Sequence, residues 1–166
     1  MIRPRSDDDL DACESLARTV HFVDGYPAYI PNDDFRSFFA TTGALAAFVG
    51  VLDDEIVGHV ALHRSTAPVA MALAQSRLGI EAARLGVIAR LMVAPTARRR
   101  GLARALLETV TDAARERGLV PILDVVTRHY GAVALYESVG WRQLGTVDFS
   151  LPDGSIIQEF VYAAPR

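Results

Sequence analysis

Cysteine, lysine and long apolar runs are scarce or missing in this sequence of 166 residues. Cys13 is the one cysteine, which excludes a disulfide within the chain and a zinc site built on several thiolates, and we expect no metal. The most apolar run, residues 43–52, is about half as long as a membrane-spanning helix, and no apolar signal core follows the first residues. We therefore expect a cytoplasmic protein that does not enter a membrane.

The charge balance is close to neutral, since 17 basic and 20 acidic residues give a net charge of −3. This balance argues against general affinity for nucleic acids. Because the chain has no lysine, a phosphate site would have to use arginine side chains and backbone N–H groups. The length and the hydrophobic content of 51% fit one folded domain over residues 1–166.

Apolar spacing predicts an alternation of strands and helices along the chain. Strands are expected at residues 2–5, 46–52, 55–64, 87–93, 121–126, 141–150 and 155–162. Helices are expected after Ser6, at 35–39, at 68–83, from 102 to Gly118 and at 132–139, with residues 21–34 as a loop. This order predicts an α/β (α+β) domain with a mixed sheet, in which the strands at 87–93 and 121–126 are parallel.

The stretch from Arg98 to Arg104 lies between a predicted strand and a long helix. Arginine at a helix N-terminus is unfavourable by ~0.3–1 kcal/mol, and a bound anion would reverse that effect. The small residues Gly101 and Ala103 would let such an anion approach the backbone. The alternative is a solvated basic turn with no ligand. A Walker loop needs a lysine and a dinucleotide loop needs three glycines, but the next glycine after Gly101 is Gly118.

Two segments of the chain resemble the GCN5-related N-acetyltransferases, the GNAT family. Arg98-x-x-Gly101-x-Ala103 is similar to the acetyl-CoA signature of that family, and Ala132-x-x-Leu135-Tyr136 followed by Gly140-Trp141 is similar to its second motif. The clear match covers about residues 87–141. The resemblance implies a mixed, mostly antiparallel seven-stranded sheet flanked by helices, with a central parallel β-α-β unit that binds acetyl-CoA. Members of the family often form homodimers.

The resemblance also assigns roles to individual residues. The backbone of Leu91, Met92 and Val93 would pair with the pantetheine arm, and a strand N–H near Met92 or Val93 would stabilise the oxyanion. Tyr136 would protonate the departing thiolate, the alternative being a half-buried core tyrosine. The residues implied to bind the cofactor are Leu91, Met92, Val93, Arg98, Arg99, Arg100, Gly101, Leu102, Ala103, Arg104 and His129.

The sequence departs from the family pattern at two places. His129 stands seven residues before Tyr136, where the family often has asparagine, and the alternative for it is a surface histidine. The glutamate that is often found on the strand before the acetyl-CoA loop is missing, because Val87 and Ala89 occupy that region.

Acetylation of an amine needs a base, because an alkyl amine with a pKa near ~10 is mostly protonated at neutral pH. Asp124 is the first candidate, since it interrupts an apolar run where an unpaired carboxylate would be costly. Some family members that modify protein N-termini carry a glutamate at the matching position. A purely structural aspartate is the alternative. His59 and His63, four residues apart, are the second candidates, and a water chain is a third.

The sequence thus predicts an enzyme that moves the acetyl group of acetyl-CoA directly to a primary amine of a small molecule or peptide. Cys13 falls on the apolar stripe of the first helix, so an acetyl-cysteine intermediate is not expected. The alternative is a non-catalytic acyl-CoA-binding module on the same fold. Which amine is acetylated stays open. Acidic and aromatic residues of the loop at 21–34 would suit a cationic amine, although solvated acids are common in loops.

Overall fold

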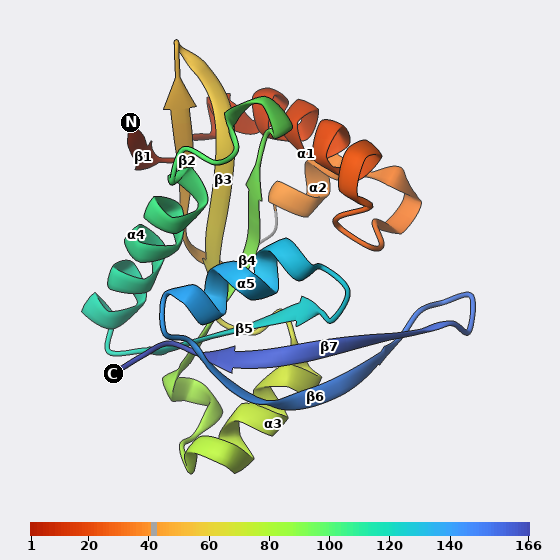
Figure 1. Cartoon of the computed structure of the whole chain (residues 1–166), viewed down its shortest axis with the longest axis vertical. Coiled ribbons are helices and arrows are strands. Elements are labelled where there is room, and N and C mark those ends of the chain that lie inside the picture. Colours follow the sequence, from red (N-terminus) through yellow and green to blue (C-terminus); the bar gives the residue numbers. More distant parts are fainter. Residues whose placement is uncertain (41–42) are drawn as a thin grey trace. The chain divides into compact units, whose positions relative to one another are not determined.

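The computed structural model describes residues 1–40 and 43–166 as an α/β structure with seven strands and five α-helices (Figure 1). The strands are β1 (Ile2–Pro4), β2 (Ala44–Leu52), β3 (Glu55–His63), β4 (Leu85–Val93), β5 (Val120–Val126), β6 (Arg142–Ser150) and β7 (Ile156–Ala163). The helices are α1 (Leu10–Asp24), α2 (Phe35–Phe39), α3 (Pro68–Leu78), α4 (Leu102–Glu116) and α5 (Tyr130–Ser138). Every strand and helix expected from the sequence is present.

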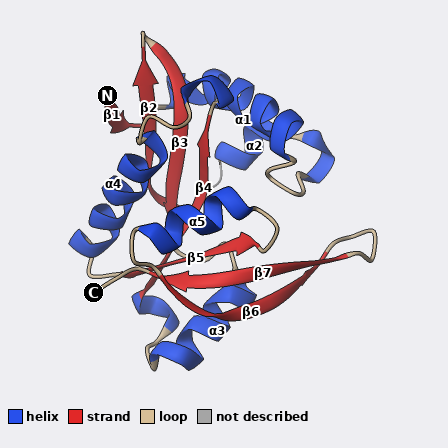
Figure 2. Ribbon diagram, viewed as in Figure 1, coloured by secondary structure: helices blue, strands red, loops and turns tan. Residues whose placement is uncertain are grey.

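The strands form one sheet in the order β1-β2-β3-β4-β5-β7-β6 (Figure 2). Strands β4 and β5 are parallel, whereas β1 with β2, β5 with β7, and β6 with β7 are antiparallel. Asp53 and Asp54, with φ of 50° and 63°, form the tight turn between β2 and β3. The predicted mixed sheet with a parallel β4–β5 pair is therefore confirmed.

The chain divides into two compact units. The first unit comprises Met1–Leu62 and Arg90–Val110, and the second comprises His63–Ala89 and Thr111–Arg166. Strand β4 and helix α4 contribute residues to both units. In the part of the chain that the structure describes, no helix combines the length and the apolar character needed to cross a membrane.

Helix α1 supplies much of the core of the first unit. Its predicted stripe is buried, and Val20 continues the stripe with 2% of its surface exposed. The helix therefore runs on to Asp24 and ends at Gly25, whose φ of 69° is the left-handed conformation usual after a helix. The prediction that the loop begins at residue 21 was wrong, because the burial of Val20 and the glycine stop decide where α1 ends.

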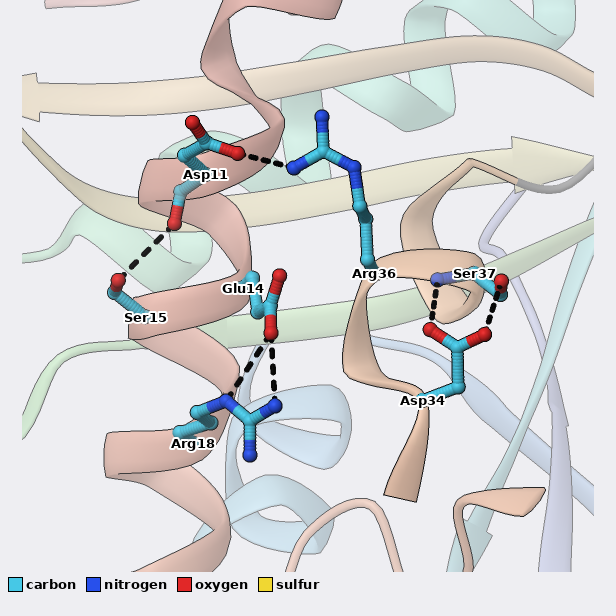
Figure 3. Close-up of polar contacts among 7 residues, drawn as sticks. All are labelled: Asp11, Glu14, Ser15, Arg18, Asp34, Arg36 and Ser37. Carbon is cyan, nitrogen blue, oxygen red and sulfur yellow. Dashed lines mark hydrogen bonds and ion pairs between the residues drawn. The ribbon is translucent and has the colours of Figure 1, made fainter. Parts of the chain in front are cut away.

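Helix α2 is capped at its start and linked to α1 by an ion pair (Figure 3). The carboxylate of Asp34 accepts a hydrogen bond from the Ser37 backbone N–H at 3.0 Å and so caps the start of α2. The Arg36 guanidinium is ion-paired with Asp11 of α1. On the buried side of α2, Phe39 is 1% exposed. This short helix is held by its surroundings, as expected for only five residues.

Helix α3 covers one face of β5, β6 and β7 in the second unit. Its residues Ala70, Met71 and Ala74 are buried in a cluster that includes Val161 of β7. The helix ends at Leu78, before the left-handed Gly79, so it is shorter than the predicted helix at 68–83. The remainder of that stretch contains one short 3-10 turn, Ala82–Arg84.

Candidate functional site

The loop between β4 and α4 in the first unit leaves backbone donors open at the start of a helix. The Gly101 carbonyl accepts the Ala105 N–H at 3.0 Å, so the N–H groups of Leu102, Ala103 and Arg104 precede the first bond of the helix. Gly101 has a φ of +77°, and a Cβ added there would meet no atom within 4 Å. This open, small-residue helix start fits a pyrophosphate, which is what the predicted role of the loop requires.

The arginines of this loop differ in their contacts and in their exposure to solvent. The Arg98 Nε donates to the Val93 carbonyl at 3.0 Å, and its Nη1 donates to the Asp24 carboxylate at 3.1 Å. Arg98 thus ties the loop to the ends of β4 and α1, and its predicted direct contact with the cofactor stays a prediction. Arg99 and Arg100 are exposed and carry positive charge at the open helix start.

Strand β4 is irregular just before the predicted pantetheine segment, Leu91 to Val93. Arg90 has a φ of +59°, a left-handed conformation that costs a non-glycine residue about 1–2 kcal/mol. A single left-handed residue departs from regular strand geometry and changes the direction of the backbone beside it. Beyond the segment, the Ala94 N–H donates to the Val57 carbonyl of β3 at 2.8 Å.

Both histidines proposed as alternative bases are buried. His59 is 0% exposed and His63 is 1% exposed. The His59 Nδ1 lies 3.0 Å from the Arg90 carbonyl, and its ring packs edge-on against Phe39 with centroids 4.7 Å apart. Because this ring is held inside the first unit by those contacts, the structure favours a role in packing and positioning for His59.

Tyr136 lies in an aromatic cluster of the second unit. Its ring centroid is 6.2 Å from that of Trp141 and 5.9 Å from that of Tyr162, and the residue is 7% exposed. The Tyr162 hydroxyl donates to Glu137 at 3.0 Å, and burial followed by this bond raises the pKa of Tyr162 to about 12. The Tyr136 ring is therefore packed against Trp141 and Tyr162, neither of which ionises at neutral pH.

His129 immediately precedes α5. Its backbone N–H donates to the Val126 carbonyl at 2.9 Å, and its own carbonyl accepts the Val133 N–H at 3.1 Å. These bonds fix the turn from β5 into the helix that carries Tyr136. The predicted contact between the His129 side chain and the cofactor stays a prediction.

Asp124 has a carboxyl neighbour that the sequence analysis did not select. In the antiparallel register Asp124 lies opposite Val161, and Glu159 lies opposite Val126, so the two acids are diagonal neighbours on one face. Both are half-buried. Burial first, and then the charge of Asp124, raise the pKa of Glu159 to about 8. In the described residues neither carboxyl has an ion pair, and the side-chain hydrogen bond between the two acids raises the pKa of Glu159 further.

The predicted acid and the predicted base lie on opposite faces of β5. Tyr162, which packs against Tyr136, pairs with Leu123, whereas Asp124 pairs with Val161 on the face covered by α3. Successive side chains of a strand alternate between faces, so the Asp124 side chain and the Tyr136 ring flank the strand from two sides. The two side chains therefore do not share a face of the sheet.

Cys13 and the loop acids also have defined environments. Cys13 is 0% exposed, and burial raises the pKa of its thiol to about 11, which disfavours the nucleophilic thiolate.

Asp24 is paired with Arg98, and Asp34 caps α2. These two acids of the loop at 21–34, which the sequence analysis considered for a cationic amine, therefore have partners within the first unit.

Comparison with known protein families identifies the family of this chain. The model of the acetyltransferase (GNAT) family matches residues 11–141. The chain belongs to this family. The match confirms the resemblance drawn from the two motifs. Acetyl-CoA is accordingly the co-substrate of this GNAT protein.

Solved structures of GNAT enzymes share the fold of this GNAT protein. NAA60 from Arabidopsis thaliana, in complex with acetyl-CoA, is 18% identical with a TM-score of 0.73, covering 98% of this chain and 96% of that chain. The ribosomal-protein-alanine N-acetyltransferase from Brucella melitensis is 20% identical with a TM-score of 0.72, covering 98% of each chain. An N-acetyltransferase from Staphylococcus aureus Mu50 is 16% identical with a TM-score of 0.73, covering 98% of this chain and 96% of that chain. A search among curated protein sequences finds no significant match.

Proposed function

We propose that this GNAT protein transfers the acetyl group of acetyl-CoA directly to a primary amine of a small molecule or peptide. The observation that carries the proposal is the open start of α4, where Gly101 leaves free space beside the first N–H groups of the helix and Arg99 and Arg100 add positive charge. In the second unit, the motif tyrosine Tyr136 lies on α5, held by aromatic neighbours.

The residues present divide the chemistry as follows. In the second unit, Asp124, with Glu159 beside it, takes a proton from the acceptor's ammonium group and leaves a neutral amine. The amine nitrogen bonds to the thioester carbonyl carbon, and negative charge develops on the carbonyl oxygen, which a backbone N–H donor would stabilise. As the carbon–sulfur bond breaks, the Tyr136 hydroxyl gives its proton to the thiolate, and the newly bonded nitrogen releases its second proton to solvent, which leaves a neutral amide. The base has then gained one proton and the tyrosine has lost one, and exchange with solvent resets both.

Direct transfer agrees with the state of the single cysteine. An acetyl-cysteine intermediate would need an accessible thiolate, and Cys13 is both buried and held in the thiol form by its raised pKa of about 11. A single domain over residues 1–166, a homodimer and a cytoplasmic location belong to the same proposal.

Thermal unfolding with acetyl-CoA tests the cofactor site. At a concentration of 100 times Kd, binding should add ~2.7 kcal/mol, a shift of several degrees in Tm. Gly101→Glu should abolish the shift, because the new carboxylate would project where the pyrophosphate lies. Gly79→Glu is the matched control: Gly79 also has a positive φ, +67°, and open space beyond it, but it ends α3. Gly79→Glu should suffer similar backbone strain and should keep the Tm shift caused by acetyl-CoA.

The outcomes separate the hypotheses. A shift that Gly101→Glu loses and Gly79→Glu keeps, together with acetylated product from a panel of amines, supports the transferase. Binding without product from any amine would favour a non-catalytic acyl-CoA-binding module. No shift at millimolar acetyl-CoA would overturn the proposal, and dephospho-CoA in parallel reports what the 3′-phosphate adds.

A further inference from the structure

His59 of β3 makes an unusual contact for a core histidine. It is 0% exposed, and its Nδ1 lies 3.0 Å from the carbonyl oxygen of Arg90 on β4. A carbonyl can only accept, so Nδ1 carries the hydrogen and donates it. In the neutral ring the other nitrogen, Nε2, is then a lone-pair acceptor, and it faces the Arg5 guanidinium with Nη1 at 3.5 Å. The surroundings therefore select one tautomer of His59.

The residue that accepts this bond is the left-handed residue of β4. Arg90 has a φ of +59°, and its guanidinium lies over the Phe38 ring at 4.5 Å from the centroid. A left-handed residue departs from regular strand geometry, and its conformation has to be held by the contacts around it. The His59 side chain supplies a donor for that carbonyl, and the Phe38 ring supports the side chain of the same residue.

The segment that follows Arg90 is the one proposed to pair with the pantetheine arm. Strand β3 holds it at both ends: His59 donates to the carbonyl before Leu91, and the Val57 carbonyl accepts the Ala94 N–H after Val93 at 2.8 Å. The second contact is an ordinary backbone bond. The first depends on the identity of one side chain, which makes it the contact that a substitution can remove.

We infer that His59 is a positioning residue for the cofactor. By hydrogen-bonding the Arg90 carbonyl it holds the left-handed turn in β4, and that turn sets the direction of the backbone groups of Leu91 to Val93. The inference rests on the proposed function, because it assumes that these backbone groups receive acetyl-CoA. His59 itself touches no substrate.

A matched pair of substitutions separates the hydrogen bond from simple packing. His59→Asn keeps an N–H donor near the position of Nδ1, whereas His59→Leu has a similar size and no donor. His59→Leu should raise both the Kd and the KM for acetyl-CoA about tenfold, the effect of one lost hydrogen bond, with a smaller change in kcat. His59→Asn should restore most of the affinity. His63→Leu, which removes the other buried histidine of β3, should leave the Kd unchanged.

Calorimetric titration with acetyl-CoA and steady-state kinetics give these constants. If His59→Leu binds acetyl-CoA as wild type does, or if His59→Asn and His59→Leu are equally weak, the inference is wrong while the proposed function stands. If wild type itself binds no acetyl-CoA, the proposed function fails first.

A measurement on the wild type keeps the test independent of whether the variants fold. Nitrogen-15 NMR of the histidine rings should show the Nδ1–H tautomer for His59, and its signals should shift when acetyl-CoA is added. The inference would be overturned if His59 were the Nε2–H tautomer, or if its ring signals did not shift at saturating acetyl-CoA.

Discussion

Asp124 on β5 and Glu159 on β7 are diagonal neighbours, two register positions apart, on the same face of the sheet in the second unit. At this diagonal spacing long side chains reach each other. Two half-buried carboxyls with no ion pair in the described residues cannot both ionise easily, and burial together with the charge of Asp124 raises the pKa of Glu159 to about 8. An isolated aspartate would be a weak base toward an amine, whereas a pair that releases its last proton near pH 8 is much better matched to one.

The first prediction concerns the pH dependence of activity. The pair works as a base only after it has lost its shared proton, so kcat/KM should rise with pH and level off above about 8. Glu159→Gln removes the like charge, so this limb should disappear and the plateau should fall, because a lone Asp124 is a weaker base. The measurement is kcat/KM from pH 6 to 9.5 with an acceptor whose own amine pKa is near ~10. An unchanged limb near pH 8 in Glu159→Gln would show that the pair does not set it.

The second prediction concerns stability, which should fall as pH rises, whereas activity should increase. Glu159 has a folded-state pKa of about 8, well above its ordinary value of 4.5, so between these values the folded chain binds one proton more than the unfolded chain. The free energy of unfolding should therefore fall as pH rises through this window. Glu159→Gln, which cannot ionise, should lose that decline and be more stable than wild type at pH 8 to 9. Urea unfolding at several pH values measures it, and parallel curves for the two proteins would contradict it.

The third prediction concerns Tyr136. Tyr136→Phe keeps the ring packed against Trp141 and Tyr162 and removes only the hydroxyl. Loss of a general acid should lower kcat by about 10²–10⁴-fold while the Kd for acetyl-CoA stays near the wild-type value. An acceptor assay and a thermal-shift titration measure the two effects. Tyr162→Phe is the control, since it removes a hydroxyl of the same cluster that is bonded to Glu137. Undiminished turnover in Tyr136→Phe would exclude the role.

The sequence predicted the strands, the helices and the acetyl-CoA motif, but it did not predict the contacts between residues that are distant in the chain. Apolar spacing located every strand, and the glycine at 101 was correctly placed at the start of a helix. Glu159 was missed because the register of β7 against β5 brings it to Asp124, and spacing within one strand carries no register. The left-handed Arg90 was missed because arginine gives no local signal for a positive φ. The positioning contact of His59 was missed because its carbonyl partner lies 31 residues away in the chain, so the sequence offered only the general acid–base chemistry of histidine.

The last prediction tests direct transfer through the single cysteine. Cys13 lies on the buried stripe of α1, and burial raises the pKa of its thiol to about 11, so neither access nor ionisation favours acetylation there. Cys13→Ala should keep the wild-type kcat, and it should cost ~1 kcal/mol of stability, the effect of a cavity of about methyl size. Initial-rate kinetics should show both substrates bound before product leaves, in place of the ping-pong pattern of a covalent intermediate. Loss of activity in a Cys13→Ala protein that still melts cooperatively, or ping-pong kinetics in wild type, would argue for an acetyl-cysteine and against attack by the amine on the thioester.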